Sequence, residues 1–125
     1  MSNKWTAEKK AAFLSELTAN ELTQIKLSQY IIHFIFVEGS SITVESGFQH
    51  IDKEGNILSN FEVYGEEKIV TVHRLLGTKI ANINSDDDEN VLQIKFDQGD
   101  ILKIFRDPNL SESYAIYLNG SHHVV

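Results

Sequence analysis

The chain has 125 residues, a length that fits one domain over residues 1–125, and its 42% hydrophobic and 23% charged residues are typical of a folded globular protein. Because it contains no cysteine, disulfides, thiolate metal sites and a thiol nucleophile are excluded. Acidic residues number 18 against 11 basic ones, and the formal net charge of −7 disfavours nucleic acid and membrane surfaces as partners and favours a basic protein.

The N-terminal segment, residues 1–5, is polar and lacks the apolar stretch of a secretion signal. The longest apolar run, residues 30–37, is interrupted by His33 and is too short to cross a bilayer. We therefore expect a cytoplasmic protein of a bacterial or similar cell.

The first half of the chain predicts a helix followed by strands. Over residues 6–20, Thr6 can cap a helix and Glu8 would lie in its first turn. Phe13, Leu14 and Leu17 form a narrow apolar stripe at helical spacing. Strands follow over residues 22–27, 30–37 and 41–48, with a tight glycine turn at residues 38–40.

The second half predicts the same kind of succession. A helix is expected over residues 66–76, ended by Gly77, although the β-branched residues 70–72 are also compatible with a strand. The predicted strands cover residues 79–84, 91–96, 101–106 and 113–118, with a short one at residues 124–125. Residues 97–100 form the hairpin turn between the second and third of these.

The two halves resemble each other. Residues 36–44 match residues 96–104, because each segment ends a strand on phenylalanine, turns at glycine and resumes with aliphatic side chains at the same alternate positions. These patterns predict two similar helix-plus-antiparallel-meander halves, about residues 6–60 and 66–125, in an α+β fold whose helices pack on a mainly antiparallel sheet. A chance similarity of two hairpins is the alternative, and whether the halves form one sheet or two stays open.

The second half also carries recognisable strings at residues 73–80, 91–104 and 112–114. They resemble a bacterial small-domain family of unknown function, whose members run leucine-leucine-glycine, a strand, a phenylalanine-acidic-glycine hairpin, and then glutamate, a small residue and an aromatic residue. The resemblance covers residues 66–118 well. It implies a small protein without established catalytic residues, and some members of the family are immunity-like. The acidic insertion before Val91 departs from the pattern of the family.

The most unusual local feature is the acidic run of Asp86, Asp87, Asp88 and Glu89. It could be a solvated turn, a patch for a basic partner or a hard-cation site, but it lacks the alternate ligands and the central glycine of an EF-hand loop. A second partner contact is predicted from Glu112 and Tyr114, whose positions fall on one face of a strand. Packing at a sheet edge would explain the same two residues.

No motif in the sequence indicates catalysis or a cofactor. The five histidines show no zinc-ligand spacing, no serine lies in a nucleophile elbow, and the isolated glycines form no phosphate-binding loop. The sequence therefore predicts a non-enzymatic protein-binding domain, in its specific form an immunity protein that neutralises a toxin by occlusion. The alternatives are a self-associating homodimer and a small-ligand domain with a pocket between the two halves.

Overall fold

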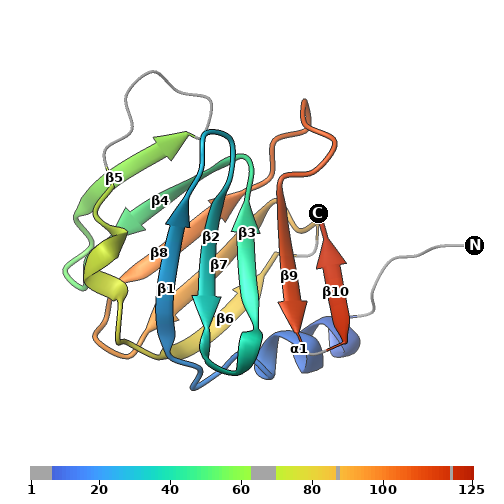
Figure 1. Cartoon of the computed structure of the whole chain (residues 1–125), viewed down its shortest axis with the longest axis horizontal. Coiled ribbons are helices and arrows are strands. Elements are labelled where there is room, and N and C mark those ends of the chain that lie inside the picture. The colour runs from blue at the N-terminus through green and yellow to red at the C-terminus, as the bar shows by residue number, and fades with distance from the viewer. Residues whose placement is uncertain (1–6, 63–69, 87, 119) are drawn as a thin grey trace, which may run out of the picture.

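The computed structural model describes residues 7–62, 70–86, 88–118 and 120–125, and they form two antiparallel sheets that face each other across one core (Figure 1). The predicted α+β fold is wrong: the described residues contain ten strands and a single α-helix, α1 (Ala7–Ser15). Each sheet is covered by the other sheet rather than by helices. The molecule is a β-sandwich.

Each sheet has five strands, and every pairing is antiparallel. The first sheet has the order β1 (Leu22–Leu27), β2 (Ile32–Phe36), β3 (Ser41–Val44), β9 (Tyr114–Leu118) and β10 (Ser121–Val124). The second has the order β5 (Ile57–Glu62), β4 (Gly47–Ile51), β8 (Ile101–Phe105), β7 (Val91–Phe96) and β6 (Ile80–Ser85).

The predicted helices are shorter than the sequence indicated. α1 ends at Ser15, packs against β6 and buries Leu14, and Leu17 is buried in the turn that follows. The helix is not long and apolar enough to cross a membrane. Of the second predicted helix, residues 66–69 lie outside the described residues, and the rest forms only the 3-10 helix η2 (Val72–Leu75). The β-branched residues 70–72 oppose an α-helix because their side chains lose rotational freedom there.

The predicted strand over residues 41–48 is in fact two strands in different sheets. β3 ends at Val44 and β4 begins at Gly47, so the chain crosses from one sheet to the other at residues 45–46. The alternation of buried residues continues across this crossing, through Ser46 to Phe48, and therefore gives no signal of it. The sequence also missed β5 and most of β10, the last strand of each half, which both lie at sheet edges.

The two sheets have the same strand order. Read from its other edge, the second sheet has the order β6-β7-β8-β4-β5, and the first sheet has the order β1-β2-β3-β9-β10. Strands β6, β7 and β8 thus correspond to β1, β2 and β3, and strands β4 and β5 correspond to β9 and β10. Each half supplies three consecutive strands to one sheet and its last two strands to the opposite sheet. The halves do not form separate helix-plus-meander units: they form two sheets, each of which contains strands from both halves.

Local details follow the same correspondence. β1 has a register shift directly after Leu22, and β6 has one directly after Ile80. The amide of Leu22 donates to the carbonyl of Thr78 at 2.9 Å, and the amide of Ile80 donates to the carbonyl of Asn20 at 3.0 Å. These reciprocal bonds join the starts of β1 and β6 around one point of approximate two-fold symmetry.

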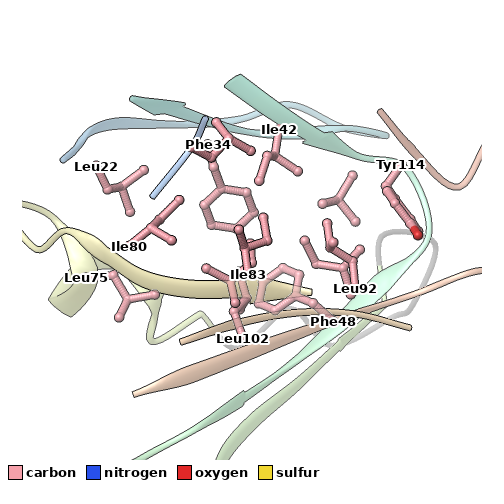
Figure 2. Packing of buried hydrophobic residues seen from close by; sticks show 14 of the residues in the cluster. Leu22, Phe34, Ile42, Phe48, Leu75, Ile80, Ile83, Leu92, Leu102 and Tyr114 are labelled. Atoms are coloured by element: carbon pink, nitrogen blue, oxygen red, sulfur yellow. The ribbon is translucent and has the colours of Figure 1, made fainter. Parts of the chain in front are cut away.

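The core lies between the sheets. Figure 2 shows Phe34 and Ile42 of the first sheet pointing toward Phe48 and Leu102 of the second. The Phe34 and Phe48 rings meet edge to face with centroids 5.8 Å apart, and Phe48 stacks on Phe61 at 4.8 Å. Such pairs add attraction beyond the burial of apolar surface, so they help to fix how the sheets face each other.

Candidate functional site

The connections β3–β4, β6–β7 and β8–β9 lie at one end of the sandwich. β3 ends at Val44 opposite Tyr114, where β9 begins. β8 ends at Phe105, which lies opposite Gly47 of β4 and opposite Val91 of β7. The carboxylates of this end, which we call the acidic end, belong to Glu45, Glu62, Asp86, Asp88, Glu89, Asp107 and Glu112.

The predicted acidic run lies at this end, and its members differ in exposure. Asp86 and Asp88 are exposed, Glu89 is half-buried, and Asp87 lies outside the described residues. Tyr114 is buried and lies beneath the run, where its hydroxyl donates to the carbonyl of Glu89 at 2.8 Å. Burial, and then the nearby charges of Glu89 and Asp86, raise the pKa of Tyr114, so its hydroxyl stays a donor.

Further contacts fix the acidic run in place. The Glu89 carboxylate accepts from Nε2 of His123 at 3.0 and 3.1 Å. The amide of Val91 donates to Oδ1 of Asp86 at 3.2 Å, and Nζ of Lys10 in α1 donates to the carbonyl of Asp86 at 2.8 Å. Strands β7 and β10 and helix α1 therefore all hold this connection, so its carboxylates are displayed in one arrangement.

Glu112, the other predicted contact, lies beside Glu45 rather than beside the acidic run. The pKa of Glu45 is raised by partial burial and by the adjacent Glu112 carboxylate. Neither residue forms a salt bridge with a cation in the described part of the chain. Two carboxylates in contact without a cation repel each other, and such pairs are found more often at functional sites than elsewhere.

A pocket of about 320 Å³ opens at the same end, between the two halves of the chain. Its lining comes from β4, β5, the end of β8 and the adjoining β3–β4 and β8–β9 connections: Ser46, Gly47, Phe48, Asn60, Phe61, Glu62, Phe105, Arg106 and Asp107. The Phe105 side chain is 37% exposed, whereas Phe48 and Phe61 are buried. The pocket thus combines aromatic surface with charges of both signs.

A buried polar network lies elsewhere, between β4, β8 and η2. The fully buried His50 contacts Oδ2 of Asp100 through Nε2 at 2.8 Å and Oγ1 of Thr71 through Nδ1 at 2.6 Å. Nε of Arg74 lies 3.0 Å from the same Asp100 oxygen, and the Ser59 hydroxyl lies 3.2 Å from Oγ1 of Thr71. Asp100 accepts from both cationic and imidazole donors, as a buried carboxylate requires.

This network has the order hydroxyl, imidazole and carboxylate, which is also that of a nucleophilic triad. However, the His50 ring is wholly buried, and its residues do not line the pocket at the acidic end. Burial, the largest influence, lowers the pKa of His50, although Asp100 acts in the opposite direction. The geometry therefore fits a neutral imidazole that ties η2 to the second sheet.

The sequence does not predict this network, and it predicts a pocket between the two halves only as an alternative, without naming its lining residues. The signal for His50 was present, because it continues the alternation of buried positions through Ser46 and Phe48. Its partner Asp100 falls in a predicted turn, and Thr71 and Arg74 fall in a segment that the sequence predicts as helix. The pocket joins residues that are far apart in the chain, so no local pattern could reveal it.

Within the described ranges, no group of three or more histidine or acidic side chains is arranged to hold a metal ion. No family model matches the chain, and no curated protein or solved structure matches it either. A function must therefore be argued from the geometry and charge of the sites themselves.

Proposed function

We propose that this chain is a non-enzymatic, cytoplasmic protein-binding domain whose acidic end covers a basic surface of a partner protein. The observation that carries the proposal is the gathering of carboxylates from β5 and from the β3–β4, β6–β7 and β8–β9 connections at one end of the sandwich. A net charge of −7 would arise with any distribution of acidic residues, but the fold concentrates them.

The Glu45–Glu112 pair gives this surface a specific reason to bind cations. In the free protein the two carboxylates repel each other, and this repulsion contributes to the raised pKa of Glu45. A lysine or arginine of a partner placed between them would replace repulsion with charge-assisted hydrogen bonds. Binding would thus relieve an unfavourable contact as well as form favourable ones.

The held conformation of the acidic run supports the same proposal. Because Asp86 and Glu89 are fixed by Lys10, Val91 and His123, little conformational entropy would be lost when a partner binds them. A solvated turn without function needs no such support from three elements.

The specific form of the proposal is an immunity protein that occludes the basic active-site surface of a toxin such as a nuclease. This form rests on the resemblance of residues 66–118 to a bacterial small-domain family of unknown function, some members of which are immunity-like. Complementary charge would steer the encounter, so association would be fast at low salt and slow at high salt.

The test is affinity capture from the native cell, followed by measurement of the dissociation constant for the captured partner. The acidic-end variant E45Q/D86N/D88N/E112Q should raise this constant at least about tenfold at low salt, and less at high salt. The matched control E16Q/E38Q/E54Q/D97N removes as many charges from exposed positions in other connections. Equal affinity of both variants, whether unchanged or equally weakened, would contradict the proposal.

Self-association is a second candidate, favoured by the outer face of the first sheet. Tyr117 and Val124 of neighbouring strands are 40% and 39% exposed there, and the Tyr117 ring stacks on His122 with centroids 5.9 Å apart. Sedimentation velocity at micromolar concentration separates the candidates. A stable dimer of the isolated chain that the Y117A substitution dissociates would favour self-association, whereas a monomer would exclude it.

A further inference from the structure

The pocket at the acidic end is built around a glycine on the outer face of the second sheet. Gly47 pairs with Glu62 on one side and with Phe105 on the other. Because Gly47 has no side chain, strand β4 places no side chain between Glu62 and Phe105 at this position. A Cβ at this position would lie 2.5 Å from the carbonyl oxygen of Phe61, so a larger residue would force the backbone to shift.

The rim of the pocket carries more negative than positive charge. Glu62 and Asp107 supply carboxylates, and among the described residues of the lining Arg106 is the only cation. Neither Glu62 nor Arg106 forms a salt bridge with another described residue. A cationic ligand therefore has an available carboxylate partner in Glu62, next to an exposed aromatic ring.

Of the cationic side chains, arginine fits this combination best. Its planar guanidinium stacks on an aromatic ring and forms two parallel hydrogen bonds with one carboxylate, whereas a lysine ammonium does neither as well. Phe105 offers the ring and Glu62 the carboxylate on opposite sides of Gly47. The volume of about 320 Å³ lies at the lower end of the range for small-molecule pockets, which suits one side chain rather than a large cofactor.

The pocket is continuous with the rest of the acidic end. The amide of Asp107 donates to the Ser113 hydroxyl at 2.8 Å, and the amide of Glu45 donates to the carbonyl of Ser113 at 2.8 Å. A partner that covers the Glu45–Glu112 pair would therefore reach the pocket as well. Interfaces of this kind commonly depend on one arginine or aromatic anchor in a pocket, surrounded by weaker contacts.

We infer that this pocket binds the anchoring arginine side chain of the basic partner, with the guanidinium stacked on Phe105 and paired with Glu62. The inference rests on the proposed function, because it identifies which chemical group of the partner the acidic end recognises.

The first test uses a small probe that carries the side chain alone. Titration with N-acetylarginine amide at low salt should shift the amide resonances of Gly47, Asn60 and Phe105, with a dissociation constant on the order of 1 mM. N-acetylcitrulline amide has nearly the same shape without the charge, and it should bind at least about fivefold more weakly. Equal binding of the two probes, or shifts spread evenly over the acidic run, would overturn the inference.

Substitutions in the pocket provide the second test. F105A and E62Q should each raise the dissociation constant of the arginine probe about threefold or more. The controls L76A and E54Q change an exposed hydrophobic residue and an exposed carboxylate elsewhere, and they should leave it unchanged. Since E62Q removes a charge and little volume, it keeps the test decisive if F105A disturbs the fold.

The two proposals fail in different ways. Normal capture of the partner by the F105A/E62Q variant, together with weak capture by the acidic-end variant, would overturn the arginine pocket and support the proposed function. Binding of the arginine probe in the pocket, together with normal capture by the acidic-end variant, would support the pocket as an arginine site and contradict the proposed function.

Discussion

Ala19 and Gly77 share one left-handed backbone conformation, with φ angles of 71° and 84°. The Ala19 amide donates to the carbonyl of Ile80 at 2.7 Å, and the Gly77 amide donates to the carbonyl of Leu22 at 2.8 Å. The two residues therefore occupy corresponding positions just before β1 and β6. Only one of them is the glycine that this conformation favours, since an L side chain costs roughly 1–2 kcal/mol there.

This relationship predicts opposite effects of two substitutions. A19G should stabilise the fold by about 0.5 kcal/mol, because relief of the strain exceeds the greater backbone entropy of glycine in the unfolded chain. G77A should destabilise it by about 1 kcal/mol, and only through the backbone, because a Cβ there meets nothing within 4 Å. Urea unfolding measures both. Destabilisation by A19G would show that the two connections are not equivalent.

The buried network predicts strong coupling between His50 and Asp100. In the other half of the chain, the corresponding positions hold Ile116 and Ser40, so the scaffold itself accepts an apolar residue where His50 lies. H50I alone should destabilise by about 1–3 kcal/mol, because it removes a hydrogen-bond partner from buried groups. The double variant H50I/D100S should recover part of this loss in urea unfolding. Additive losses would mean that the two residues act independently.

The network also predicts how stability depends on pH. Burial lowers the pKa of His50 in the folded state below the unfolded value of about 6.5. The Asp100 carboxylate raises this pKa, and the Arg74 charge lowers it further. The unfolded chain then binds the proton more readily, so the contribution of His50 is complete above about pH 6.5 and is lost as the pH falls toward the folded pKa. The difference in unfolding free energy between the wild type and H50Q should therefore shrink from about pH 7 to pH 5. A difference that grows toward pH 5 would contradict a neutral buried imidazole, and H73Q, at an exposed histidine, is the control.

The Glu45–Glu112 pair predicts that a loss of charge raises stability. The raised pKa of Glu45 means that its ionised form is disfavoured in the folded state. This cost to folding stability is present above the folded pKa and absent at lower pH. E112Q should therefore stabilise the chain at neutral pH by up to about 0.5 kcal/mol, because this surface is partly solvated. Thermal unfolding of E112Q, compared with that of the control variant E54Q, measures this gain in stability. If the proposed function holds, the same substitution weakens partner binding, so stability and binding change in opposite directions.

Much of the fold was readable locally, and the global arrangement was not. Strand β7, residues 91–96, follows from the alternation of apolar side chains, and the turn at Gly39 follows from the positive φ that glycine permits. Both signals are local properties of the sequence. The exchange of strands between the sheets depends on the two crossings of the chain after Val44 and after Phe105. At the first of them the alternation of buried side chains continues without a break, so the sequence does not reveal it. The sequence predicts too long a helix around η2, because the same apolar spacing also fits a short 3-10 helix that packs on the core.

The candidate site was predictable only in part. The acidic run and Glu112 stand out by charge, which is a sequence property, but the sequence does not show that Glu112 contacts Glu45. The sequence predicts Tyr114 as an interface contact, whereas in the structure its hydroxyl donates to the backbone carbonyl of Glu89 in the acidic run. To predict contacts between residues that strand exchange brings together, one must know the strand register of both sheets.

Hydrogen exchange of the chain, alone and in complex with its captured partner, tests the acidic end as the binding surface most directly. We predict slower exchange on binding for amides of residues 45–47, 88–91 and 105–113, and no change for the hairpins at residues 37–40 and 97–100. Protection confined to those hairpins, or to the outer face of the first sheet, would contradict the account.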